Sequence, residues 1–346
     1  MRIFTIVVMA IAISLVVAGS LSFKKMSDES RRKFFNVVMG FQLVLTLGLI
    51  YMGAMTVSTR SGMAFPDWPT SDGVLWPSWN YFMSQDDRFY EHVHRLFGQV
   101  VGLFGIFIFV LAFIYERKRN FRHAGIIFFM ICIQGALGAI TVLNNTLWLT
   151  TVLHGVFAQI CLAAMGFLIL RNTKTYQEIL DSDSFSPKVL GLAKSTLILV
   201  VIQLILGAVF RNKAKVFTEN PNGKIIYKEV LEGNFGWLYS HMTFALPVAI
   251  LVFVLGIVLF KTKGETKLPK FFGIALHSMI SLQILLGLVA FFTVHHRARG
   301  KFGFAETALT SGHVVNGAMI LMLVFMIYRM VIRAGKAKIT AEKEVS

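Results

Sequence analysis

The chain has 346 residues, of which 55% are hydrophobic and only 15% are charged, and its mean hydropathy is +0.67. These values lie outside the range of soluble globular proteins and exclude that class. The net charge of +16 would suggest nucleic acid in a soluble protein. Here the basic residues follow membrane topology instead, so no nucleic-acid partner is expected.

A membrane-spanning helix needs about 20 mainly apolar residues. The sequence contains nine such runs, and the loops between them are too short to hold a separate soluble domain. We therefore predict an all-α integral membrane protein with nine spans, at residues 3–22, 34–57, 93–115, 123–143, 149–170, 191–211, 237–260, 271–293 and 310–333.

The first run, residues 3–22, has two interpretations. It is either a cleaved signal peptide, because small residues occur at Ala18, Gly19 and Ser20, or an extra transmembrane helix. Cleavage would leave the basic residues that follow it on the outer side, against the positive-inside rule. We favour an N-terminal anchor and cytoplasmic linker over residues 1–33. The absence of an Arg- and Ser-rich transit peptide favours a bacterial inner membrane over an organelle.

Basic residues gather in alternate loops, which predicts the orientation of the spans. The less basic segments 58–91, 144–149, 212–236 and 294–309 are placed outside, and the C-terminal tail, residues 336–346, is placed in the cytoplasm. The cytoplasmic clusters are Lys24, Lys25, Arg31, Arg32 and Lys33, then Arg117, Lys118, Arg119 and Arg122, then Lys261, Lys263, Lys267 and Lys270, and finally Arg329, Arg333, Lys336 and Lys338.

An internal repeat relates the two halves of the chain. Three spans carry the pattern Gln-x-x-x-Gly, beginning at Gln134, Gln203 and Gln283, and a looser version begins at Gln42. A histidine follows each of these in the next span. The series Gln42, His94, Gln134, His154 maps onto Gln203, His241, Gln283, His313 with offsets of 161, 147, 149 and 159 residues. We predict two homologous four-helix bundles in tandem, at residues 34–175 and 190–335.

The four repeated histidines are expected within about the first turn of helices that run inward from the outer face. An ionisable residue inside a span is a functional hypothesis by default, and imidazole suits iron. Two pairs at one depth would hold two flat heme groups between helices. We favour this over four histidines that only hydrogen-bond their neighbours, because chance does not reproduce the register. The four are His94, His154, His241 and His313.

Only one of these histidines has an acid beside it. Glu91 precedes His94 by three residues, so the two side chains share one side of the helix. The corresponding positions before the other three histidines hold Thr151, Leu238 and Thr310. An N-terminal helix cap is the alternative role for Glu91. The asymmetry predicts a reactive N-terminal bundle with Glu91 as the catalytic residue and a C-terminal bundle that holds a cofactor.

The outer segment that precedes Glu91 contains many turn-forming residues and reads as an ordered cap at the membrane surface. Its sequence from residue 60 is Arg-Ser-Gly-Met-Ala-Phe-Pro-Asp-Trp-Pro. Arg60 in this segment and Arg95 after His94 are candidates for pairing with heme propionates, because the arginine fork suits carboxylates.

These motifs resemble the heme A synthase family over roughly residues 34–333. The resemblance rests on Glu91-x-x-His94-Arg95, on the Pro66-Asp-Trp-Pro69 loop and on the helix segments around the other three histidines. Many bacterial members have a cysteine pair in the first outer loop. Here the corresponding places, near Phe65 and Ser71, are not cysteines, which puts a thiol step in doubt.

The resemblance implies oxidation of the C8 methyl group of heme O to a formyl group, giving heme A for cytochrome c oxidase. It implies that His94 and His154 ligate the substrate heme, that His241 and His313 ligate the iron of a heme B cofactor, and that Glu91 is essential. The implied partners are a heme O synthase, an unidentified electron donor and membrane lipid. The alternatives are a non-catalytic di-heme cytochrome b that relays electrons from quinol and, less favoured, a transporter or heme chaperone.

The first testable prediction concerns topology. A reporter fused after Ser346 should behave as cytoplasmic, because the densest basic clusters require that orientation. Paired reporters that fluoresce only in the cytoplasm or are active only outside it would measure this. An external C-terminus would overturn the whole assignment of loops.

Overall fold

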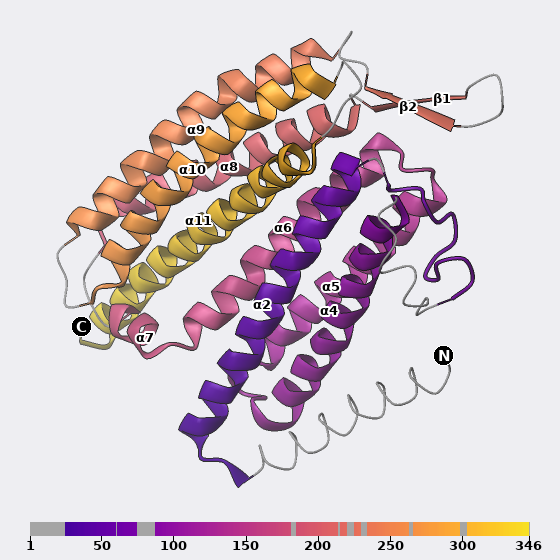
Figure 1. Ribbon diagram of the computed structural model, residues 1–346. Coiled ribbons are helices and arrows are strands. Elements are labelled where there is room, and N and C mark those ends of the chain that lie inside the picture. The colour runs from indigo at the N-terminus through magenta and orange to yellow at the C-terminus, as the bar shows by residue number, and fades with distance from the viewer. Residues whose placement is uncertain are drawn as a thin grey trace. The chain divides into compact units, whose positions relative to one another are not determined.

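A computed structural model of the chain describes residues 25–59, 61–74, 87–180, 185–213, 215–219, 225–229, 234–262, 266–297 and 303–345. Over these residues long helices dominate, and the described strands form one short antiparallel hairpin (Figure 1). The predicted all-α class is confirmed. Contacts divide the chain into two compact units, residues 1–146 and residues 147–346.

The described part of the first unit contains three long helices. The central one packs against both of the others. A turn closed by backbone hydrogen bonds of Arg119 and Asn120 to Glu116 joins the second helix to the third. The three helices are α2 (Asp28–Thr59), α4 (Asp87–Tyr115) and α5 (Phe121–Leu143).

Among its described residues, the second unit has five long helices, one short helix and the hairpin. Helix α9 packs against α8 and α10, and α11 packs against α6, α8 and α10. The elements are α6 (Trp148–Arg171), α7 (Lys174–Leu180), α8 (Pro187–Lys213), β1 (Lys215–Glu219), β2 (Ile225–Glu229), α9 (Phe235–Lys261), α10 (Leu268–Arg297) and α11 (Phe304–Val345).

Close backbone approach, not large side chains, sets the crossing of α9 and α10. A Cβ built on Gly273 would lie 2.6 Å from the carbonyl oxygen of Gly256 and 2.9 Å from the backbone nitrogen of Phe260. Only glycine fits such a contact, and small residues at helix crossings are typical of membrane bundles.

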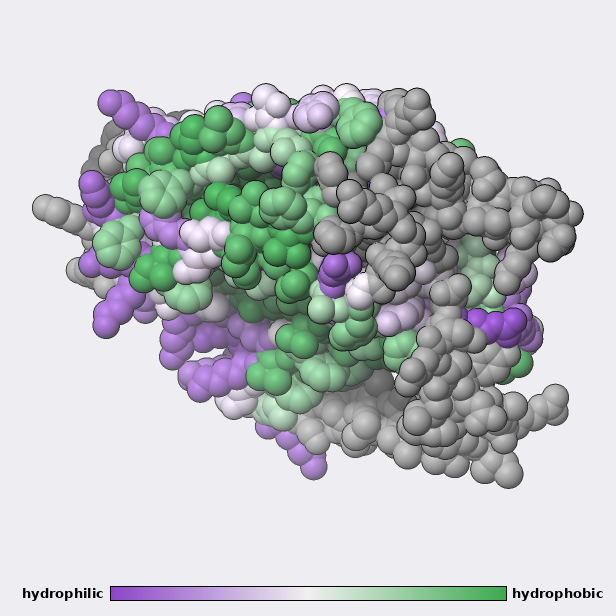
Figure 2. All heavy atoms as spheres, turned by 45° about the horizontal axis from the view of Figure 1, so that its top comes forward, coloured by the Kyte–Doolittle hydropathy of each residue, from purple (hydrophilic) through white to green (hydrophobic). Residues whose placement is uncertain are grey.

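Eight described helices are long and apolar enough to cross a membrane, which confirms eight of the nine predicted spans. The predicted span at residues 3–22 lies outside the described residues. Figure 2 shows hydrophobic residues over a wide field of the described surface and hydrophilic residues at its edges, as lipid contact requires. Helix α4 begins at Asp87, six residues before the predicted start at 93, because its first two turns are polar and paired with a loop.

Two elements were not predicted. The short helix α7 buries Tyr176 and Ile179, which are three residues apart and therefore share one face. The hairpin β1–β2 lies in the segment predicted as an outer loop, and Phe217 stands opposite Tyr227 in its register.

Helix α6 groups with the second unit. Gly166 lies against Met322 of α11, and Arg329 of α11 stacks on the ring of Phe167 at 5.1 Å. The predicted bundles, residues 34–175 and 190–335, instead assign α6 to the first half, by sequence repeat. The division by repeat stays a prediction, and contacts and repeats follow different boundaries here.

Candidate functional site

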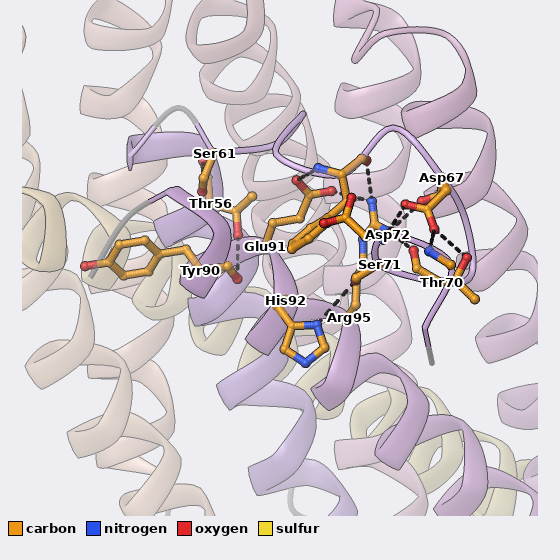
Figure 3. Close-up of polar contacts among 12 residues, drawn as sticks. Thr56, Ser61, Asp67, Thr70, Ser71, Asp72, Tyr90, Glu91, His92 and Arg95 are labelled. Atoms are coloured by element: carbon orange, nitrogen blue, oxygen red, sulfur yellow. Dashed lines mark hydrogen bonds and ion pairs between the residues drawn. The ribbon is translucent and has the colours of Figure 1, made fainter. Parts of the chain in front are cut away.

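The first turns of α4 hold the outer loop, which we define as residues 61–74. Arg95 is the centre of this contact (Figure 3). Its two terminal nitrogens donate to the backbone carbonyls of Phe65, Asp67 and Thr70 and to the carboxylate of Glu91, and the bond to Phe65 is 2.8 Å long. The guanidinium group is thus directed to protein oxygens, and a heme propionate would have to compete with them.

Glu91 is 3% exposed and connects Arg95 to the loop backbone. Its Oε1 accepts from Arg95, and its Oε2 accepts from the backbone N–H of Phe65 at 3.1 Å. The sequence left open whether Glu91 caps the helix or acts chemically. The structure adds a third role, because both oxygens of this carboxylate bind the loop–Arg95 assembly.

A second carboxylate folds the far part of the outer loop. Asp67 accepts from the backbone N–H groups of Asp72 and Gly73 and from the Thr70 hydroxyl. Burial alone would raise the pKa of Asp67, but these hydrogen bonds outweigh it and lower the pKa to about 2 from its ordinary 3.8. Because the pKa of Asp67 is lower in the folded protein, its carboxylate stabilises the loop at pH values above the unfolded pKa. This contribution to stability is lost as the pH falls toward 2.

His92 and His94 serve different neighbours. His92 is 2% exposed, and its Nδ1 lies 3.3 Å from the Ser71 hydroxyl, against the outer loop. His94 faces α2, where its Nδ1 lies 3.1 Å from the carbonyl oxygen of Leu49. A carbonyl only accepts, so Nδ1 of His94 carries the proton and the lone pair of the neutral ring lies on Nε2. That tautomer is the usual one for a metal ligand.

His241 and His313 lie together in the second unit. Their ring centroids are 6.4 Å apart and the ring planes are inclined by 79°. Each ring has a buried Nδ1 for which no hydrogen-bond partner occurs among the described residues. Buried polar atoms without partners are rare and often mark a bound group.

Three of the candidate ligand histidines each pack against a glycine on the neighbouring helix, a contact that we call a glycine seat. A Cβ built on Gly53 would lie 2.7 Å from Cε1 of His94, and one built on Gly207 would lie 2.7 Å from Cε1 of His241. The Cβ on Gly287 would lie 3.2 Å from Cε1 of His313. The rings therefore lie close against a helix backbone only because no side chain is present there.

These glycines correct the register of the repeat. Gly53 and Gly207 differ by 154 residues, and the same offset pairs Leu49 with Gln203. The sequence pattern matches Gln42 to Gln203. In the structure, however, Gln42 donates to the carbonyl of Val101, seven residues beyond His94, whereas Gln203 donates to the carbonyl of His241 itself. Gln42 therefore lies about two turns deeper than Gln203.

The depth of the histidines also differs from the sequence expectation. His94, His154 and His241 lie seven, six and six residues after the first residue of their helices, and His313 lies nine residues after its own. They are thus about two turns inside rather than in the first turn, because each helix begins before its apolar run.

A glycine seat alone does not identify a ligand. His277 lies against Gly256, but its Nε2 lies 3.0 Å from the carbonyl oxygen of Phe253. That geometry is typical of a packed structural histidine. His154, on α6, is partly buried, and its pairing with His94 stays a prediction. Arg60 lies outside the described residues.

The sequence interpretation missed two cations at the end of α8. Arg211 lies close enough to His313 for its charge to act on the ring. The Lys213 ammonium group stacks on Trp148 at 4.7 Å and on Trp237 at 5.2 Å. The signal was present, because both cations directly follow an apolar run at the end of the helix. The predicted span ends at Arg211, so Lys213 falls in the predicted outer loop although α8 continues to it.

The fold and these histidines define a multi-pass membrane protein with paired imidazoles inside its spans. The family model of the cytochrome oxidase assembly proteins (COX15-CtaA) matches residues 36–298, and the chain belongs to that family. This confirms the resemblance drawn from the motifs.

Three curated relatives are named heme A synthase. The protein from Pelagibacter ubique is 24% identical over 291 residues, covering 72% of this chain and 84% of that protein. The one from Chelativorans sp. is 31% identical over 126 residues, covering 34% of this chain and 33% of its own length. The one from Mesorhizobium japonicum is 26% identical over 137 residues, covering 36% of each chain.

The second prediction concerns the outer loop. Arg95→Ala should lower the free energy of unfolding by about 3 kcal/mol or more, because it leaves the buried Glu91 carboxylate without its counter-charge. Protease cleavage within residues 61–74 should accelerate as well. Thermal unfolding of the purified protein and timed proteolysis measure both effects.

Arg88→Ala is the matched control. Arg88 also bridges α4 to the outer loop, through Asp72, but those side chains are 48% and 43% exposed, against 8% and 4% for Arg95 and Glu91. An exposed pair contributes about 1 kcal/mol or less. Equal losses in the two variants would contradict the assignment of Arg95 as the anchor.

Proposed function

We propose that this chain is a heme A synthase, a membrane oxidoreductase that converts the C8 methyl group of heme O to a formyl group. Membership of the cytochrome oxidase assembly family and the names of the relatives support the chemistry. The observation that carries the proposal is the set of seated imidazoles: His94 in one unit, and His241 with His313 in the other.

The pair His241 and His313 fits a heme B iron. Their ring centroids are 6.4 Å apart, so both imidazoles would be within reach of one iron if heme B were bound. The nearby charge of Arg211 supports the same assignment, because a heme also brings carboxylates that need a cation.

His94 fits a ligand of the substrate heme. The carbonyl of Leu49 fixes its tautomer, and Gly53 lets the ring lie against α2. His154 is the proposed second ligand. With O₂ as the oxidant, the net change balances as one methyl group and one O₂ giving one formyl group and one water. The heme iron supplies the oxidising chemistry when it is bound.

The chain's own contribution is orientation and electrostatics. Arg95 holds the outer loop against the first turns of α4, and the proposed role of this loop is to limit water near His94. The proposed role of Glu91 is to place a fixed negative charge one turn from that ligand, where it stabilises positive charge that develops on the oxidised methyl carbon. The bond from Phe65 and the ion pair with Arg95 hold the carboxylate in place.

The third prediction tests this function. Membranes that contain the chain together with a heme O source should yield heme A, identified by the mass of extracted heme. Unchanged heme O together with two tightly bound hemes would instead support a di-heme electron relay. Glu91→Ala should lower the heme A yield by about a hundredfold, the typical loss for one preorganised charge-stabilising group.

Arg95→Ala separates catalysis from anchoring in the same assay. Arg95→Ala breaks the same ion pair as Glu91→Ala and removes more of the contacts with the outer loop, but it keeps the carboxylate of Glu91. We expect Glu91→Ala to lose much more product than Arg95→Ala when both are normalised to bound heme B. Equal losses would reduce Glu91 to a loop anchor and remove the main reason to call it catalytic.

The fourth prediction concerns the cofactor site. Gly207→Ala should displace the His241 ring and reduce the low-spin heme B signal, because the new Cβ would lie 2.7 Å from Cε1. Gly191→Ala on the same helix is the control, because a Cβ there meets no atom within 4 Å. Optical spectra and heme content of the purified variants decide it. Full heme B in Gly207→Ala would exclude the proposed seat.

A further inference from the structure

A chain of amide groups reaches the ring of His313. Nδ2 of Asn316 lies 2.9 Å from the carbonyl oxygen of Met279 and 2.7 Å from Oε1 of Gln283. Nε2 of Gln283 lies 3.2 Å from Nε2 of His313. All four residues belong to α10 and α11, and Asn316 is buried.

Hydrogen-bond chemistry fixes the direction of this chain. A backbone carbonyl only accepts, so the end of Asn316 that faces Met279 must be its NH₂ group. The same NH₂ group faces Gln283, which must therefore present its oxygen to Asn316 and its NH₂ to His313. An amide NH₂ has no lone pair to offer. Nε2 of His313 is thus the acceptor, and it carries the lone pair of the ring.

That lone pair is also the one that an iron needs. Nδ1 of His313 carries the ring proton in this tautomer and is not available to a metal. A single lone pair accepts the hydrogen bond from Gln283 or binds iron, but not both. The amide chain therefore favours the tautomer of His313 that can bind iron through Nε2. At the same time, the amide group of Gln283 competes with iron for the lone pair on that nitrogen.

We propose that Gln283 is a displaceable stand-in for iron at His313, oriented by Asn316, and that it sets how tightly the C-terminal site retains heme B. The proposal rests on the proposed function in one respect, the assignment of His313 as a heme B ligand. Gln283 is a positioning residue here. It satisfies a buried nitrogen whenever the iron bond is broken and must move aside when that bond forms.

The repeat supplies a matched control. Gln203 is the first glutamine of the same bundle, and it too donates to the next histidine-bearing helix. Its Nε2, however, bonds the backbone carbonyl of His241 at 3.0 Å and not the imidazole. Gln203→Leu therefore removes one interhelical hydrogen bond from an amide without removing a competitor of iron.

The experiment measures heme B binding to the full-length chain produced without a heme supply. Heme B is titrated into the purified protein and followed by its absorption, and its loss to an excess of a heme-free scavenger protein gives the dissociation rate. Gln283→Leu should bind heme B about fivefold more tightly and lose it more slowly, the size expected for one competing hydrogen bond. Gln203→Leu should show no tightening.

The sign of the change separates the possible roles of Gln283. Weaker binding in Gln283→Leu would mean that the amide supports the ligated ring, and an unchanged affinity would make it a packing contact; either result overturns the proposal. Gln283→Asn is the second variant, because its shorter side chain withdraws the amide from the ring while it keeps a polar group. It should tighten binding in the same direction.

His313→Ala distinguishes failure of this inference from failure of the proposed function. Loss of low-spin heme B in His313→Ala, together with no tightening in either Gln283 variant, would refute the stand-in alone. If His313→Ala keeps its full low-spin heme B, His313 is not a ligand. That result would remove the basis of this inference and of the heme B site in the proposed function.

Discussion

Inside a membrane a polar side chain has no water to bond, so it must find its partner in the protein. Threonines solve this locally: Thr46 and Thr196, for example, donate to the carbonyl four residues earlier in their own helix. Amide side chains solve it between helices, as Gln42 does at Val101 and Asn316 at Met279. These bonds hold the helices in register. They also restrict chemistry to the few groups that have bonding capacity left over.

Histidine is the residue with such capacity, because a neutral ring has one nitrogen that donates and one that accepts. At His94 the backbone of α2 takes the Nδ1 proton, which places the lone pair of the ring on Nε2. At His277 a backbone carbonyl also takes the donor, but that donor is Nε2. The orientation of the ring, and not its presence in a span, thus separates a ligand candidate from a packed histidine. The glycine seats are common to both.

Hydropathy alone predicted eight spans that the structure confirms, because a run of about 20 apolar residues nearly always forms a membrane-spanning helix. It failed at the polar ends. The first turns of α4 are polar, and Glu91 and Arg95 there bind the outer loop, so the apolar run begins six residues after the helix does. The same limit explains the missed helix α7, which has seven residues and only two buried ones to signal its face. The motifs predicted the family because they are local in sequence. They did not predict that Arg95 binds loop carbonyls, since those partners are 25 to 30 residues away.

The register of the repeat shows what sequence comparison within one chain can and cannot reach. Matching Gln42 to Gln203 kept residue type constant, whereas the structure keeps the contact constant: Gly53 and Gly207 both support an imidazole, and Leu49 takes the place of Gln203. The first half therefore fixes its histidine through a backbone carbonyl, which side-chain substitution cannot remove. The second half surrounds its histidines with amide side chains, one on the backbone of His241 and one on the ring of His313. Side-chain partners can move aside while the helices stay in place, and a backbone carbonyl cannot. On physical grounds, the polar partner of the His313 ring can therefore move while the helices stay in place, whereas the partner of the His94 ring is fixed by helix α2 itself.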